Sequence, residues 1–531
     1  MLKTIALAAL IAQTGLAAPL AAQPPEDRPP RRSAASPAQQ PHESKADSKP
    51  AAIEPAAEPS ETPVTTTHAI MIGGKTIHYT ATAAQMPIRS RTGETEAHIF
   101  YIAYTVTDTP KEAVRPLLFA FNGGPGSASL WLHMGAIGPK RVKLGPNGSL
   151  PPPPYMLVDN ESSWLDKADL VFIDPVGTGF SRAVKPELGS KFWSVDGDIE
   201  SLTEFIRLYL TRNKRWGAPL FVAGESYGTV RGAGLAHDLL DHGISLSGLA
   251  LISSLMNFRS IEAEGRNDSA YPLILPTYAA AAWYHHKLPK SVTDLRRLLA
   301  EAERWAEDAY PTVLAHGDNL TPAERKEALD RLERYTGLER RILNENNLRI
   351  NMGIFMTQLL HSERLTLGAY DSRYVGMAGY PTPREGSYDP SYTAVRAPFT
   401  TLFNQYVHSD LNYQTEMPYY VLGEGLTSSW NYGPGGESSL DMSGRLRSAL
   451  VENPFMKLLV AAGHYDLVTP FYQARYTMSH LGLPETIRKN VTFREYEAGH
   501  MMYLDTPSRM KLKADVAAWI DSALLPGAAA R

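Results

Sequence analysis

The sequence predicts an α/β fold with a mainly parallel central sheet, flanked by helices and carrying a helical cap insertion. Short apolar runs suited to buried strands recur along the chain, and several precede a Gly-rich turn and a helix-like stretch. The interval 259–454, between two such runs, carries helical patterns without a clear core strand. In folds of this class the functional loops gather at the carboxyl ends of the strands.

The strand-like runs share a short length and a high apolar content. They are 75–80, 98–107, 115–121, 168–173, 220–223, 249–253, 457–462 and 491–495. The run 115–121 is almost entirely apolar, which is typical of a strand covered on both faces. The runs predict a core in two parts, 67–258 and 455–531.

The interval 259–454 is predicted to be the helical cap. Thr321 begins a capping box, with Pro322 at the first helical position and Glu324 three residues after the cap. A second amphipathic helix is expected over 291–306. Both helices lie in the chain between the two parts of the predicted sheet.

The first 66 residues are predicted to lie outside the core. Residues 1–22 have Lys3 near the start, an apolar stretch and small residues at the end, which indicates a signal peptide. Residues 23–66 are rich in Pro and Ala, which favours a disordered spacer. The alternative, a membrane anchor, requires a longer apolar span. We therefore expect a secreted or periplasmic protein without stable membrane insertion after signal cleavage.

Composition narrows the classes of partner. The 531 residues include 52 basic and 56 acidic side chains and no Cys, so nucleic acid is not an expected partner and disulfides are excluded. His285 and His286 are adjacent on an expected helix and cannot bind one metal together. The sequence 196–198 lacks the other ligands of a calcium loop. No metal and no cofactor are expected.

Ser226 is the candidate nucleophile. It stands in the pattern Gly224-x-Ser226-x-Gly228, which by itself is a weak signal. Here the pattern follows an apolar run and precedes a helix-like stretch, which is the strand-turn-helix context of a nucleophile elbow. A serine hydroxyl needs a base to remove its proton and a carboxylate to hold that base.

Asp466 and His500 are the candidate partners of this serine. Asp466 follows the run 457–462, and His500 follows the run 491–495. Seen alone, an Asp in a turn and a His in a loop are more often structural than catalytic. Found in the order Ser, Asp, His, each after a late strand, they favour a catalytic triad.

A glycine loop follows the run 115–121. Its sequence from Asn122 to Gly126 is NGGPG, and glycines allow backbone N–H groups to approach a substrate closely. The backbone N–H groups of Gly124 and Tyr227 are the predicted oxyanion donors. A turn that needs glycine only for its backbone angles is the alternative.

At these positions the chain resembles the serine carboxypeptidase family of α/β-hydrolases, as a bacterial-type member. The resemblance is carried, in the family's order, by FNGGPGSAS, FIDPVGTGFS, AGESYG, AGHYDLVTP and AGHMMYLDTP, and extends over about residues 95–515. It implies removal of a C-terminal residue from a peptide substrate with a free C-terminus. Ser226 would form an acyl-enzyme, His500 would act as base and then acid, and Asp466 would orient the histidine.

The resemblance also implies a site for the terminal carboxylate of the substrate. In the family this site is made by residues that match Asn122, Gly123 and Glu225. Many secreted members have a second Glu at the position of Ala136, so one acid of the usual pair is absent. Ser127 replaces the family's Cys in the glycine loop.

Two other functions remain open at this point. An acyltransferase or esterase on the same scaffold would use the same acyl-enzyme chemistry with another acceptor. A hydrolase fold used only for binding is the third possibility, which the intact set of candidate residues argues against.

Overall fold

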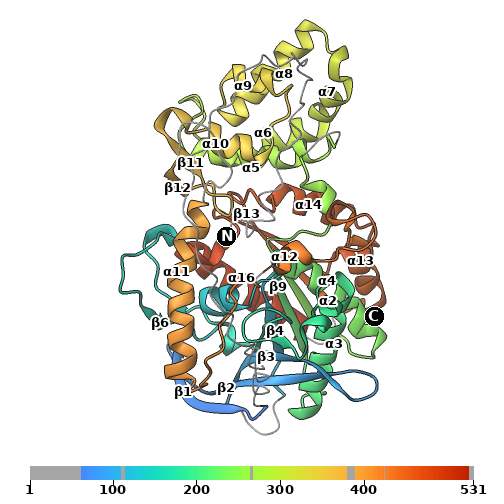
Figure 1. The fold of residues 1–531 in the computed structure, drawn as a ribbon. Helices are drawn as coiled ribbons and strands as arrows, with labels where there is room; N and C mark the ends of the chain where they lie inside the picture. Colours follow the sequence, from blue (N-terminus) through green and yellow to red (C-terminus); the bar gives the residue numbers. More distant parts are fainter. Residues whose placement is uncertain (1–60, 109–113, 264–266, 379–388, 424, 525–531) are drawn as a thin grey trace, which may run out of the picture.

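The computed structural model describes residues 61–108, 114–263, 267–378, 389–423 and 425–524. A ten-stranded sheet runs through the described residues (Figure 1). Its strands, in spatial order, are β1 Val64–Ile72, β2 Lys75–Arg89, β3 Thr95–Val106, β7 Asp169–Ile173, β4 Leu117–Phe121, β9 Leu220–Glu225, β10 Gly248–Ile252, β13 Lys457–Gly463 and β14 Val491–Tyr496, with β8 Arg182–Ala183 paired to β3.

The sheet has an antiparallel part and a parallel part. Each neighbouring pair in the order β1, β2, β3, β7 is antiparallel. Each neighbouring pair in the order β7, β4, β9, β10, β13, β14 is parallel. Every residue of β4, β7, β9 and β10 is buried, as expected for apolar strands covered on both faces. The predicted α/β fold with a mainly parallel sheet is confirmed.

Helices cover the two faces of this sheet. On one face α3 Val195–Arg212, α4 Tyr227–Asp241 and α13 Ser443–Glu452 share a core with alternate strand residues such as Phe119 and Val222. On the other face α11 Pro390–Gln405 and α16 Thr506–Leu524 pack against the intervening residues, such as Leu118 and Ala223. The period-two alternation of each strand therefore supplies both cores.

A third core lies in a separate helical layer, which Figure 1 shows in green and yellow beyond the sheet. Its helices are α5 Ala270–Tyr284, α6 Leu295–Asp308, α7 Tyr310–His316, α8 Pro322–Thr336, α9 Arg340–Glu345 and α10 Met352–Gln358. The predicted capping box of Thr321 and Glu324 begins α8. Tyr465 and Phe471 of the sheet domain contribute to this core, so the layer rests on the loop after β13.

The interval 259–454 contributes both to the helical layer and to the faces of the sheet. The helical layer takes residues up to α10, whereas α11 and α13 return to the sheet. The interval leaves and re-enters through a paired stem, in which Phe258 N–H donates to Leu440 O at 3.0 Å and Met442 N–H donates to Met256 O at 2.8 Å.

The remaining elements are short. Apart from three-residue 3-10 helices, they are α1 Leu130–Leu132, α2 Gly189–Phe192, α12 Leu426–Ser429, α14 Phe471–Ser479, α15 Glu485–Arg488, β5 Lys140–Val142, β6 Leu157–Asp159, β11 Leu365–Leu367, β12 Val375–Met377 and the π-helices His133–Ile137 and Tyr406–Asp410.

The predicted signal peptide, 1–22, lies outside the described residues, as does the spacer up to residue 60. Strand β1 begins at Val64, so residues 64–66 of the expected spacer belong to the sheet. Among the residues that the structure describes, no helix has the length and apolar character needed to cross a bilayer.

Candidate active site

Ser226 lies on a sharp turn between β9 and α4. Its φ of 59° and ψ of −128° are unusual for a residue other than glycine, and such backbone strain is typical of a nucleophile elbow. The turn is held from the neighbouring strand, because Ser226 N–H donates to Ile252 O at 3.0 Å. Thr229 Oγ1 donates to Ser226 O at 2.7 Å and closes the first turn of α4.

Both glycines of the motif lie in close backbone contacts. A Cβ at Gly224 would lie 2.1 Å from the Gly228 carbonyl oxygen. A Cβ at Gly228 would lie 3.0 Å from the Phe121 carbonyl oxygen at the end of β4. The pattern around Ser226 therefore has a steric cause at Gly224, where only glycine fits, whereas a side chain at Gly228 would need the end of β4 to shift by a few tenths of an ångström.

Asp466 and His500 form a buried hydrogen-bonded pair. Nδ1 of His500 lies 2.7 Å from Oδ2 of Asp466. Asp466 Oδ1 accepts the backbone N–H groups of Val468 and Thr469, and Oδ2 also accepts from Thr469 Oγ1 at 2.6 Å. The carboxylate is thereby fixed in one orientation, and it can hold the histidine with Nδ1 protonated and Nε2 free to accept a proton.

The electrostatic environment of His500 favours its charged form. Burial lowers the pKa of the ring. The charge and hydrogen bond of Asp466, followed by the charge of Glu225, raise the pKa by more than burial lowers it, so the net shift is upward. An imidazolium formed during a reaction would therefore be stabilised in place.

Ser226 follows β9 and His500 follows β14, two strands of the sheet that are separated by β10 and β13. Both residues are described, and no hydrogen bond joins the serine hydroxyl to the ring. The backbone of His500 is fixed by Ser253 Oγ, which donates to His500 O at 2.5 Å, and by Tyr370 O, which accepts His500 N–H at 2.6 Å. Ser226 is 9% exposed and Asp466 0%, so of the two only the serine can meet a substrate. Loose contacts between nucleophile and base are common without substrate.

Asn122 and Glu225 form a second buried pair beside the elbow. Asn122 Nδ2 donates to Glu225 Oε1 at 2.9 Å, and Asn122 Oδ1 accepts Leu132 N–H at 3.0 Å. Burial raises the pKa of Glu225 to about 7, although the charge of His500 and the polar groups of Tyr503 and Asn122 oppose the shift. The Glu225 carboxyl thus keeps its proton well above the usual range for Glu.

Tyr503 is a neighbour of this pair that sequence reasoning missed. Its hydroxyl and Glu225 Oε2 are both buried without a hydrogen bond of good geometry, yet the two groups are close enough for each to shift the pKa of the other. The Tyr503 ring packs on Gly135, the residue before Ala136. Ala136 is itself buried in a π-helix. Tyr503 lies in the motif AGHMMYLDTP, three residues after His500, and this is the sequence signal that could have pointed to it.

The glycine loop rests directly on the first turn of α4. A Cβ at Gly123 would lie 2.3 Å from Tyr227 N, so this contact also requires glycine. Gly124 has a φ of 104°, which favours glycine for a second reason. Tyr227 is the first residue of α4, where an N–H has no intrahelical acceptor. Within the described part of the chain, no protein acceptor takes the N–H of Gly124 or Tyr227.

Asp174 supports the far side of the same loop and was also missed. Its Oδ1 accepts Ser129 N–H at 2.8 Å, and burial raises the pKa of Asp174 to about 7. A Cβ at Gly179 would lie 1.8 Å from Asp174 Oδ2, so Gly179 makes room for this carboxyl. The motif FIDPVGTGFS therefore holds the segment that follows the glycine loop.

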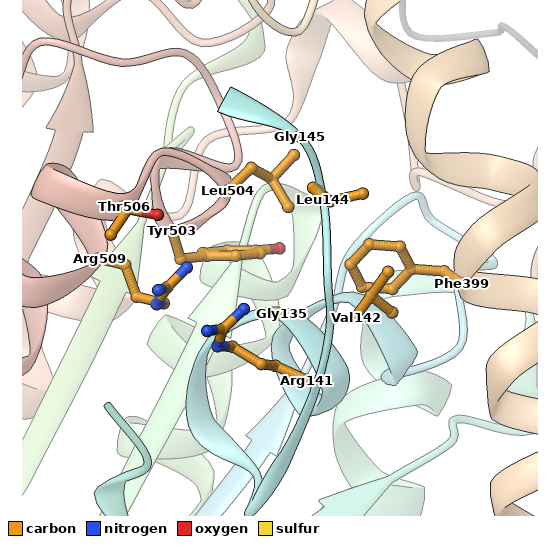
Figure 2. Close-up of a pocket in the computed structure, with 10 residues that line it drawn as sticks. All are labelled: Gly135, Arg141, Val142, Leu144, Gly145, Phe399, Tyr503, Leu504, Thr506 and Arg509. Atoms are coloured by element: carbon orange, nitrogen blue, oxygen red, sulfur yellow. The ribbon is translucent and has the colours of Figure 1, made fainter. Parts of the chain in front are cut away.

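A small pocket lies beside Tyr503, away from Ser226. Figure 2 shows the guanidinium groups of Arg141 and Arg509 on one side of the Tyr503 ring. Both arginines pair with Glu161, at 3.1 and 3.0 Å. The lining includes none of the eight predicted site residues, and its charges are already paired, so the pocket is assigned no catalytic role. No group of acidic or histidine side chains suited to a metal occurs among the described residues.

Comparisons with known proteins agree on one family. The chain is 32% identical over 180 residues to the pheromone-processing carboxypeptidase KEX1 of Saccharomyces cerevisiae, an alignment that covers 30% of this chain and 22% of that protein. A serine carboxypeptidase of Caenorhabditis elegans is 30% identical over 148 residues, which cover 27% of this chain and 26% of that protein. The alignments therefore span about a quarter of the relatives' own length.

The crystal structure of the yeast prohormone-processing carboxypeptidase matches with a TM-score of 0.55 and 17% identity, over 83% of this chain and 91% of that chain. This likeness shows the α/β-hydrolase fold. The family model described as serine carboxypeptidase matches residues 90–512, which is most of the sequence. The chain belongs to the serine carboxypeptidase family.

Proposed function

We propose that the protein is a serine carboxypeptidase, which removes C-terminal residues from peptides through an acyl-enzyme on Ser226. The observation that carries the proposal is that two buried hydrogen-bonded pairs lie at the carboxyl ends of the strands. Asp466 and His500 form one pair, and Asn122 and Glu225, beside Ser226, form the other. The first pair suits acyl transfer, and the second suits recognition of a terminal carboxyl group.

In the proposed reaction the Ser226 hydroxyl attacks the last peptide carbonyl while His500 Nε2 takes its proton. Asp466 holds the resulting imidazolium through Nδ1. The N–H groups of Gly124 and Tyr227 stabilise the negative oxygen of the tetrahedral intermediate. His500 returns the proton to the leaving amine, and the acyl-enzyme is then hydrolysed by water in the same way.

The terminal carboxylate of the substrate would bind Asn122, the Gly123 N–H and Glu225. Glu225 can contribute only when protonated, because a carboxylic acid donates a hydrogen bond whereas two carboxylates repel. Its raised pKa, about 7, allows this role up to nearly neutral pH without the second acid that Ala136 replaces. Burial by the surrounding chain would thus keep Glu225 protonated without a second acid beside it.

The preference for free-acid peptides is expected to fall as pH rises through about 7, where Glu225 becomes charged. Losing a hydrogen bond to a charged group costs about 1.5 to 3 kcal/mol, or roughly ten- to a hundredfold in kcat/KM. The Glu225→Gln variant keeps a donor and should show a flatter KM against pH. Because the Glu225 charge helps to raise the pKa of His500, the acid limb of kcat/KM should also move to lower pH.

The measurement is kcat/KM for matched free-acid and amidated peptides, with simple esters, from about pH 4 to 8. Asn122→Ala should lose much of the free-acid preference at every pH. Equal cleavage of amidated and free-acid peptides throughout would replace the carboxypeptidase proposal by the esterase or acyltransferase alternative. Unreactive peptides and esters would leave only a binding role.

We also propose that the protein is exported, as a secreted or periplasmic enzyme. The support is the N-terminal sequence, with Lys3, an apolar stretch and small residues up to Ala22. The exported chain is expected to begin between residues 18 and 23, which intact-mass measurement of the secreted or periplasmic fraction would reveal. Exported protein that still begins at Met1 would contradict signal cleavage.

A further inference from the structure

We propose that Arg231 is a positioning residue, which sets the direction of the backbone donors of the glycine loop. The inference rests on the proposed acyl-transfer function and deepens it. Arg231 lies on α4, one turn after Tyr227, and its side chain is 1% exposed. It faces the loop from behind, where no substrate can reach it.

The contacts of Arg231 converge on two consecutive peptide groups. Nη1 donates to the carbonyl oxygens of Asn122 and Gly123, the second at 3.3 Å. Nε donates to Asp198, a buried residue in the first turn of α3, and so anchors the guanidinium on the opposite side. The planar guanidinium can serve both directions at once, which a lysine ammonium on a flexible stem cannot.

The planarity of the peptide bond means that these contacts also fix the direction of the loop's N–H groups. In a planar trans peptide, the carbonyl and the next residue's N–H point in opposite directions. When Arg231 draws the Asn122 carbonyl toward α4, the Gly123 N–H must point away from α4. The Gly123 carbonyl fixes the Gly124 N–H in the same way. One side chain therefore aims both the proposed carboxylate donor and a proposed oxyanion donor.

The fixed direction matters because glycines give the loop little stiffness of its own. Ser127 N–H also donates to Gly123 O, at 3.0 Å, but no second donor to Asn122 O is found among the described residues. The positive charge of Arg231 polarises each carbonyl and strengthens the N–H of the same peptide group as a donor. The guanidinium carbon also lies 5.2 Å from the ring centre of Tyr227, whose N–H is the other proposed oxyanion donor.

A purely structural ion pair would account for the burial of Arg231 and Asp198 but not for the two loop contacts. The chain offers a matched control in Arg215. Its Nη1 pairs with Asp169 at 2.7 Å and its Nη2 donates to the Arg115 carbonyl oxygen at 2.8 Å. This arginine thus also binds one aspartate and backbone, but at the amino end of β7, opposite the site.

The experiment compares wild type, Arg231→Lys, Asp198→Asn and Arg215→Lys. For each we would measure thermal unfolding, the fraction of protein labelled by a fluorophosphonate, and kcat and KM for free-acid and amidated peptides. The inhibition constant of a peptide aldehyde is added, because its adduct with the serine places an oxygen in the oxyanion hole. Kinetic values are expressed per labelled site.

Removing one oxyanion donor typically costs 10²- to 10³-fold in kcat, and a donor that is misdirected should lose part of this. Arg231→Lys is expected to lose about 10- to 100-fold in kcat, to weaken aldehyde inhibition in proportion, and to reduce the free-acid preference. Asp198→Asn should change the same quantities in the same direction by a smaller factor. Arg215→Lys should affect only thermal unfolding.

If Arg231→Lys and Asp198→Asn match wild type in kcat and aldehyde inhibition, the positioning role is wrong. The same holds if their losses equal those of Arg215→Lys at a similar fall in melting temperature. If Arg231→Lys does not fold, Asp198→Asn alone decides between these outcomes. An inactive, unlabelled wild type would instead overturn the proposed function and this inference with it.

Discussion

Replacing Ser226 by Ala is expected to reduce peptide hydrolysis by roughly 10⁴-fold or more. The proposed reaction passes through an acyl-enzyme on the Ser226 hydroxyl, which alanine lacks. The loop, the Asp466–His500 pair and the Asn122–Glu225 pair should remain in place, since among the described residues no hydrogen bond is made by the Ser226 hydroxyl. Substrate binding should therefore survive the loss of turnover.

The measurements are turnover of a free-acid peptide, fluorophosphonate labelling, and peptide binding by the inactive variant. Ser201→Ala is the matched control, because its buried hydroxyl only donates to Asp198 O within α3, at 2.9 Å. It should keep nearly full activity. Purified Ser226→Ala with near wild-type turnover would sink the assignment of the nucleophile.

Replacing Asp466 by Asn is expected to lower kcat by about 10⁴-fold while the fold stays intact. The carboxylate accepts hydrogen bonds on both oxygens, from His500, Thr469 and the backbone. An Asn amide nitrogen can only donate, so it would face His500 Nδ1 with a hydrogen and leave the proton on Nε2. In that tautomer the ring cannot take a proton from Ser226.

The matched control for this substitution is Asp505→Asn. Asp505 Oδ2 accepts Ser508 N–H at 3.0 Å at the start of α16, and Asn is an equally good N-cap. NMR of the imidazole nitrogens should reveal the changed tautomer only in Asp466→Asn. Combining Asp466→Asn with Ser226→Ala should add little, because the residues act as a unit. A single variant with unchanged kcat would rule out the orienting role.

The strands of the sheet were largely predictable because their apolar runs are buried on both faces. All eight expected runs correspond to strands β2, β3, β4, β7, β9, β10, β13 and β14. Strand β1, VTTTHAIMI, was not expected. Its residues alternate between exposed and at least partly buried at the edge of the sheet, with only Ile70 and Ile72 fully buried, and its first half is mostly polar, so its sequence lacks a continuous apolar run.

The positions of α11 and α13 could not be predicted in the same way. An amphipathic pattern indicates that a helix has a buried face, but it does not say which surface covers that face. These two helices pack on the sheet although they are separated from it in the sequence by the helical layer. Only the three-dimensional arrangement distinguishes them from α5 or α8.

In the candidate site, too, some residues could be found from local sequence and others only from the packing of distant segments. Ser226, Asp466 and His500 were predictable because each stands in a short motif directly after a strand. Arg231 and Tyr503 were not, because their contacts depend on how α4 and the loop after β14 pack. The raised pKa of Glu225 likewise results from burial by segments distant in the sequence, and no spacing of residues records it.

The paired stem at Met256 to Phe258 and Leu440 to Met442 joins the helical layer to the sheet, and the two parts can therefore change at different rates in evolution. Beyond the stem, residues can be gained or lost in the helical layer without altering the register between β10 and β13. The strand ends that present Ser226 and Asp466 then stay where they are. In evolutionary terms, a lineage can remodel α5 to α10 by changes in length, but Tyr370, which also lies beyond the stem and accepts His500 N–H, has to keep its place for the hydrolytic centre to stay unaltered.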